Sequence, residues 1–115
     1  MILKVLHNVN CSKSNAVVNY LNDHQIEYEI INLVEDPLSV VELKTVLKKL
    51  NADVYSIIRK ADKAYGDYAE KDLSEEEWLS ILSQNPNLVQ RPILVKGKVA
   101  ILGRPLENVI QFIEN

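Results

Sequence analysis

One cysteine and three arginines carry most of the chemistry that this sequence offers. Lysine outnumbers arginine ten to three, so lysine meets the general need for positive charge and arginine is kept for Arg59, Arg91 and Arg104. A guanidinium group presents a planar fork of donors that grips a tetrahedral oxyanion in bidentate fashion, whereas an ammonium group acts as a hydrated point charge. This selective use of arginine indicates oxyanion recognition, with biased codon usage as the alternative.

Cys11 is the residue with nucleophilic potential. It follows a polar turn, Asn8-Val9-Asn10, and precedes Ser-Lys-Ser, which is a poor environment for an inert core cysteine. The thiolate is the reactive form, and the pKa of a thiol falls at a helix N-terminus beside cationic side chains. We therefore interpret Cys11 as a reactive thiol. A buried, inert residue is the alternative.

Three polar residues near Cys11 are candidates for supporting roles. Ser14, one helical turn further on, could donate a hydrogen bond to the sulfur, and Asn10 could cap the helix or contact the ligand. His7, as an imidazolium, could lower the pKa of the thiol, although a histidine at a strand end is more often an ordinary satisfied polar group. We interpret His24 as a surface residue.

Size and composition restrict the classes of function. A chain of 115 residues with 47% hydrophobic content can bury one core without disulfides, so we expect a single domain over residues 1–115. No apolar run of about 18 residues is present for a membrane span, and the start is too short and strand-like for a signal peptide. The formal net charge of -3 without a basic block argues against nucleic acid as the ligand. We expect a cytoplasmic monomer.

Hydrophobic periodicity predicts a β-α-β unit at the start of the chain. Residues 2–6 and 26–33 are predicted strands, and a helix from Cys11 to about Asp23 lies between them. Such a crossover should be parallel and right-handed.

The middle of the chain predicts a helical insert over about residues 36–85. Two capping boxes, Ser39 with Glu42 and Ser74 with Glu77, mark the starts of two helices. Between these helices, residues 54–58 are a predicted short helix that leads into Arg59. The path of the insert cannot be obtained from periodicity, so the position of Arg59 relative to Cys11 stays open.

A hairpin and a last helix complete the chain. Residues 92–95 and 98–101 are predicted strands joined by a two-residue turn at Lys96-Gly97, which makes Arg91 face Leu102 and puts Arg104 two residues past that pair. The order β-α-β, helical insert, β-β-α is that of the thioredoxin-like fold, an α/β class with a mixed four-stranded sheet. Open α/β sheets place ligand sites beyond the carboxyl ends of their strands, where Cys11 lies. We expect Arg91 and Arg104 to meet it there.

These residues occur in an order that resembles the glutaredoxin-linked arsenate reductases of thioredoxin-like fold. The resemblance covers nearly the whole chain and rests on four segments: His7-Asn8-x-x-Cys11-x-x-Ser14, Ile57-Ile58-Arg59-Lys60, Asn85-Pro86-x-Leu88-x-x-Arg91-Pro92-Ile93-x-Val95 and Gly103-Arg104-Pro105.

The resemblance implies an activity and a set of roles. The motif cysteine, here Cys11, is the nucleophile, and the arginines matching Arg59, Arg91 and Arg104 bind the arsenic oxyanion. Pro92 matches the cis-proline that lies against the active cysteine. Arsenate is the implied substrate, glutathione the co-substrate and glutaredoxin the protein partner, with no bound cofactor and no metal.

Two departures and one substitution qualify the resemblance. The family commonly has proline where Val9 stands and arginine where Asn15 stands, so the loop is expected to be less rigid and one cationic neighbour is absent. The related Spx-type regulators typically carry a C-x-x-C switch, whereas this chain has Ser14 at the second position. A C-x-x-S site cannot close an internal disulfide, which argues against such a regulator and requires external thiols for turnover.

Two other functions stay open. The chain could be a glutathione-dependent thiol reductase of the same fold that does not use arsenate. It could instead be a non-catalytic, Spx-like regulatory binding protein.

Overall fold

A mixed four-stranded sheet with the strand order β2-β1-β3-β4 organises the two ends of the chain. We describe residues 2–8 and 10–114 of a computed structural model. Strand β1 (Leu3–His7) pairs in parallel with β2 (Tyr28–Asn32), and helix α1 (Ser12–Asp23) connects the two. Strand β3 (Ile93–Lys96) runs antiparallel to both β1 and β4 (Val99–Leu102). The predicted mixed sheet and thioredoxin-like element order are confirmed.

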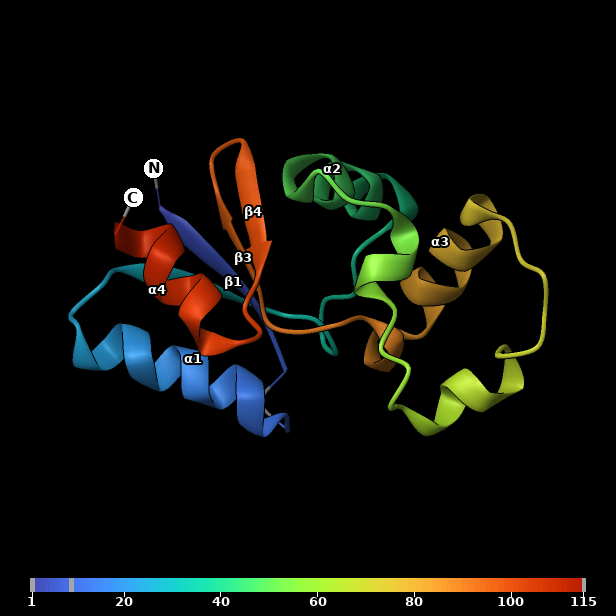
Figure 1. Ribbon diagram of the computed structural model, residues 1–115, viewed down its shortest axis with the longest axis horizontal. Helices are drawn as coiled ribbons and strands as arrows, with labels where there is room; N and C mark the ends of the chain where they lie inside the picture. The colour runs from blue at the N-terminus through green and yellow to red at the C-terminus, as the bar shows by residue number, and fades with distance from the viewer. Residues whose placement is uncertain (1, 9, 115) are drawn as a thin grey trace.

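The two faces of this sheet bury two separate hydrophobic clusters. Helix α1 and the last helix, α4 (Leu106–Glu114), cover one face, and the helical insert covers the other (Figure 1). The position of a residue along a strand decides on which face of the sheet its side chain lies, since successive residues point to opposite faces. On β1, Val5 packs in the α1 and α4 cluster, and Leu6 packs against the insert.

The insert consists of two α-helices and three short 3-10 turns. Helices α2 (Val40–Leu50) and α3 (Glu75–Gln84) begin at the capping boxes that the sequence predicted, with Ser39 and Ser74 as the N-caps. The 3-10 turns are η1 (Val54–Ile57), η2 (Lys63–Asp67) and η3 (Pro86–Leu88). In Figure 1 these elements lie together beside the sheet, with η3 leading directly towards β3.

The register of the hairpin differs from the prediction. Strands β3 and β4 pair Lys96 with Val99, so Gly97 and Lys98 form the turn rather than Lys96 and Gly97. Gly97 has a φ of 62°, and a hairpin turn that requires a positive φ at its first central position selects glycine there. The shift of two residues puts Arg91 opposite Arg104 instead of Leu102.

Among the described helices, none has both the length and the apolar content needed to cross a membrane.

Candidate active site

Cys11 is the N-cap residue of helix α1. Its backbone is extended, with φ −106° and ψ 118°, and the helix begins at Ser12. The loop before it is held by Asn8, whose carbonyl oxygen accepts from the Cys11 N–H at 3.0 Å and whose Oδ1 accepts from the Asn10 N–H at 2.9 Å. The sulfur therefore lies beside the first-turn amides of α1, where negative charge is stabilised.

Asn10 does not have the capping role that the sequence suggested, and Asn8 organises the loop instead. Asn10 is exposed and does not cap α1, because Cys11 itself holds the N-cap position without a side-chain cap bond. Asn8 is buried and organises the loop, although it appeared in the sequence analysis only as part of a motif. An asparagine that bonds the backbone two residues on is a common turn former, and that signal could have identified it. Val9, where the family commonly has proline, lies outside the described residues.

Ser14 is fully buried one turn into α1 and contacts the site mainly through its backbone. Its backbone N–H donates to the sulfur of Cys11, which lowers the pKa of the thiol. Its hydroxyl oxygen accepts from the Asn8 N–H at 3.5 Å, a long hydrogen bond. The residue thus joins the loop to the helix on which the sulfur sits.

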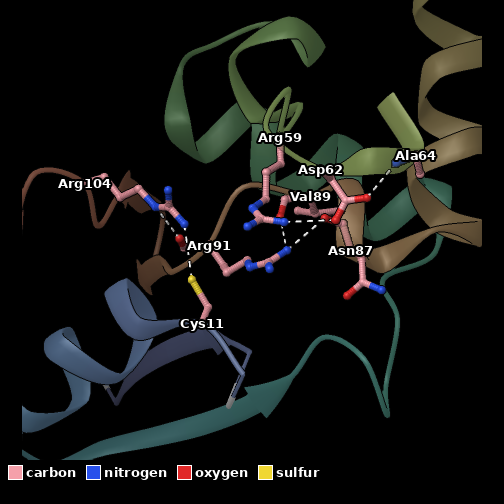
Figure 2. Close-up of polar contacts among 8 residues, drawn as sticks. All are labelled: Cys11, Arg59, Asp62, Ala64, Asn87, Val89, Arg91 and Arg104. Carbon is pink, nitrogen blue, oxygen red and sulfur yellow. Dashed lines mark hydrogen bonds and ion pairs between the residues drawn. The ribbon is translucent and has the colours of Figure 1, made fainter. Parts of the chain in front are cut away.

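Arg104 reaches the sulfur directly. Its Nη2 lies 3.3 Å from Cys11 Sγ, and its Nε donates to the carbonyl oxygen of Arg91 at 2.7 Å (Figure 2). The second bond is a consequence of the hairpin register, because Arg104 stands opposite Arg91 just past the end of the strand pair. The guanidinium group of Arg104 therefore binds the backbone of Arg91 and the thiol at the same time.

Arg91 is buried, with only 5% of its surface exposed. Its Nη1 donates to the carbonyl oxygen of Asn87 at 2.8 Å and lies 3.5 Å from that of Val89, whereas its Nε is buried without a hydrogen-bond partner. A buried cation is costly unless its donors are satisfied. The unpaired donor therefore marks a place where an anion would be bound favourably.

Arg59 is brought to the site by a contact that periodicity does not reveal. An isolated antiparallel bridge joins Ile58 to Val89, and the Arg59 N–H donates to the carbonyl oxygen of Leu88 at 2.7 Å. This seats Arg59 beside the segment that leads into Arg91. Figure 2 shows its guanidinium group next to that of Arg91, with Asp62 on the side away from Cys11.

The guanidinium group of Arg59 has an internal partner. Its Nη1 lies 3.0 Å from Asp62 Oδ2, and its Nε is buried without a partner. All three arginines that the sequence singled out thus gather around one region, with Arg104 at 3.3 Å from the sulfur and Arg91 also hydrogen-bonding to it. The acidic neighbour of Arg59 was not anticipated.

The surroundings of Cys11 favour its thiolate. Burial raises the pKa of the thiol, but the backbone N–H of Ser14, the guanidinium group of Arg91, the backbone N–H of Lys13 and the charge of Arg104 together lower that pKa to about 7. About half of the molecules then carry a thiolate at neutral pH, compared with a few per cent for a free cysteine. The Cys11 residue is buried, with 7% of its surface exposed.

His7 does not act as the imidazolium that the sequence suggested. The residue is buried, with its Nδ1 lacking a hydrogen-bond partner, and desolvation lowers the pKa of the ring. A ring that is neutral at pH 7 adds no positive charge beside the thiol. The sequence left both interpretations of His7 open because the charge state of a strand-end histidine depends on packing that a sequence does not display.

Pro92 follows a cis peptide bond from Arg91, in agreement with the resemblance; the Arg104-Pro105 bond is also cis. Pro92 is packed against Gly103, whose N–H donates to the Pro92 carbonyl oxygen at 2.8 Å. A Cβ on Gly103 would lie 2.6 Å from Pro92 Cγ, so only glycine allows this approach.

The chemistry available here is that of a nucleophilic thiolate beside guanidinium groups that can bind an anion. Guanidinium donors around the sulfur would offset the repulsion between an anionic nucleophile and an anionic substrate. In the part of the chain that the structure describes, no group of three or more His, Cys, Asp or Glu side chains could hold a metal ion.

Known proteins share both this sequence and this architecture. The model of the ArsC family matches residues 6–112. An arsenate reductase of Haemophilus influenzae is 33% identical over 116 residues, which cover 98% of this chain and all of the relative. The global transcriptional regulator Spx 2 of Lactococcus lactis is 29% identical over 106 residues, covering 90% of this chain and 80% of the regulator.

The solved structure of an arsenate reductase from Vibrio cholerae superposes with a TM-score of 0.89 at 30% identity, covering 96% of this chain and 97% of that one. Fold, family model and relatives agree over nearly the same residues. The chain belongs to the ArsC family.

Proposed function

We propose that this protein reduces arsenate to arsenite, with Cys11 as the nucleophile and with glutathione and glutaredoxin as external reductants. The observation that carries the proposal is the contact of 3.3 Å between Cys11 Sγ and Arg104 Nη2, beside a second guanidinium group, that of Arg91, which also donates to the sulfur. Membership of the ArsC family makes arsenate the natural substrate to test.

The first steps build two bonds to arsenic. The Cys11 thiolate forms a sulfur–arsenic bond, and one oxygen of arsenate leaves as water after protonation. The thiol of glutathione then replaces a second oxygen in the same way. Arg59, Arg91 and Arg104 bind the remaining oxygens and stabilise the charge that develops on them.

The redox step follows and needs a thiol from outside. Glutaredoxin attacks the glutathione sulfur, a disulfide forms between those two, and the electron pair of the broken arsenic–sulfur bond stays on arsenic, which is reduced from the +5 to the +3 state. Water then displaces Cys11 from arsenic, which releases arsenite and restores the thiol. An external resolving thiol is required because Cys11 is the only cysteine in the chain.

A coupled assay tests this proposal. Purified protein is supplied with arsenate, glutathione, glutaredoxin, glutathione reductase and NADPH, and the arsenate-dependent loss of NADPH is followed. We expect turnover by the unaltered chain, none by Cys11→Ser, and a loss of about a hundredfold in kcat for Arg91→Ala, comparable to removing one oxyanion-hole donor.

Lys96→Ala is the matched control, since it removes a cation from the far end of β3, about five residues and therefore roughly 17 Å from Arg91. Circular dichroism should confirm that each variant is folded. Wild-type rates in folded Cys11→Ser or Arg91→Ala would contradict the roles assigned.

The same assay separates the alternatives. If a mixed disulfide of glutathione replaced arsenate as the accepted substrate, the chain would be a thiol reductase of this fold. Similarity to Spx 2 favours a regulatory role as the second candidate. Ser14 counts against a disulfide switch of the C-x-x-C kind, because it leaves Cys11 without a partner in the chain.

A further inference from the structure

Asp62 forms an ion pair with Arg59, one of the three arginines that gather near Cys11. Its Oδ2 lies 3.0 Å from Arg59 Nη1, and its Oδ1 accepts from the Ala64 N–H at 3.0 Å as the N-cap of η2. The Asp62 N–H in turn donates to the Arg59 carbonyl oxygen at 3.2 Å, which closes a tight turn between the two residues. Both partners are largely shielded from water, with 25% and 20% of their side chains exposed.

The three arginines differ in what they already bind. Arg104 and Arg91 both hydrogen-bond to the sulfur of Cys11 and to backbone carbonyl oxygens, which carry no net charge. Within the described part of the chain, Arg59 alone among them forms an ion pair with a carboxylate. Arg59 is therefore the arginine whose charge a carboxylate outside the reacting group already neutralises.

The unpaired donors indicate where an anion would sit. Arg59 Nε and Arg91 Nε are both buried without partners, and the two guanidinium groups lie next to each other in Figure 2. An oxyanion bound by these two groups would approach an arginine whose Nη1 already faces a fixed negative charge. The oxyanion and the Asp62 carboxylate would repel each other, and the partial burial of Asp62 reduces the screening of this repulsion by water.

We propose that Asp62 is an internal competitor that lowers the affinity of the pocket for oxyanions by sharing Arg59 with them. In the free protein the carboxylate neutralises Arg59, and a bound oxyanion must either displace it or tolerate its repulsion. Asp62 is thus a tuning residue for the site, not a catalytic one. The inference deepens the proposed function and rests on it, since it concerns the same pocket.

The variant Asp62→Asn isolates the charge. Its side-chain oxygen can still accept from the Ala64 N–H and cap η2, so the change removes the negative charge and leaves the local turn supported. We expect the affinity for a tetrahedral dianion to rise about tenfold, because the anion no longer has to displace a carboxylate from Arg59 or overcome the repulsion of that carboxylate. Asp23→Asn is the matched control, since Asp23 ends α1, about eleven residues and roughly 17 Å from its start.

Sulfate is the probe, and Cys11→Ser is the background. Sulfate offers the tetrahedral dianion without reduction, and the serine removes the nucleophile, so calorimetric titration measures reversible binding alone. We expect Asp62→Asn to tighten sulfate binding and Asp23→Asn to leave it unchanged. Adding Arg59→Ala should abolish the effect of Asp62→Asn, since a coupling between the two residues is what the proposal requires.

Opposite outcomes would overturn the inference. Unchanged or weaker sulfate binding in folded Asp62→Asn would mean that the carboxylate positions Arg59 for the anion instead of competing for it. An effect that persists with Arg59→Ala would mean that the charge acts elsewhere.

The result is distinguishable from a failure of the proposed function, because sulfate binding needs no turnover. A chain that shows the coupling but never consumes arsenate keeps the tuning role and loses the arsenate assignment. With arsenate active, Asp62→Asn should also lower KM about tenfold while kcat changes little, a split that mere loosening of η2 would not produce.

Discussion

Removing the guanidinium group of Arg104 should make Cys11 a weaker acid. Two unit charges 3.3 Å apart interact by about 1.3 kcal/mol even when screened as in water, which corresponds to about one pKa unit. In Arg104→Ala the pKa of the thiol should therefore rise from about 7 to about 8. The thiolate fraction at pH 7 then falls from about a half to about a tenth, so alkylation by iodoacetamide should slow about fivefold.

The thiolate absorbs in the far ultraviolet, and its titration in the single-cysteine chain reports the pKa directly. Subtracting the Cys11→Ser curve removes the contribution of the five tyrosines. Arg104→Lys keeps the charge but cannot donate at once to the thiol and to the Arg91 carbonyl oxygen, so its midpoint should lie between the two. A midpoint that stays near 7 in folded Arg104→Ala would refute the idea that this contact stabilises the thiolate.

Two more results are expected. The folded-state pKa of Cys11, about 7, lies below that of an unfolded thiol near 8.5. The thiolate therefore stabilises the fold above about pH 8.5, and this contribution is lost as pH falls through 7. The free energy of unfolding in urea should exceed that of Cys11→Ser by about 2 kcal/mol more at pH 9 than at pH 6. Gly103→Ala should cost about 1–3 kcal/mol in thermal unfolding, because the new Cβ overlaps Pro92, whereas Gly66→Ala, with nothing within 4 Å, should cost little. A pH-independent difference, or equal losses for the two glycines, would contradict these expectations.

Local signals were sufficient for most of the fold. The capping boxes at Ser39 and Ser74 appear as predicted because each is closed by atoms three residues apart, and β1 and α1 follow from short-range periodicity. The hairpin register was wrong because two adjacent positions can each form the turn. The choice depends on which backbone angle Gly97 adopts, and composition alone does not specify it.

The candidate site was predictable where it follows from strand ends and unpredictable where it depends on the insert. Cys11, Arg91 and Arg104 meet because the sheet topology brings their strand ends together. Arg59 arrives through the bridge between Ile58 and Val89, a contact between segments distant in sequence that leaves no periodic trace. Asp62 lies in a polar stretch without hydrophobic periodicity, so its pairing with Arg59 has no signal in the sequence.

The Ile58–Val89 bridge also means that the pocket is assembled from both sides of the sheet. The nucleophile is the N-cap of α1, whereas Arg59 belongs to the insert and follows Ile58, a member of the insert's hydrophobic cluster. A lesion that loosens the insert would detach Arg59 while sulfur, α1 and Arg104 kept their places. Such a variant would retain a reactive thiol but bind its substrate more weakly. In a cell, its thiol would be prone to non-specific modification by electrophiles.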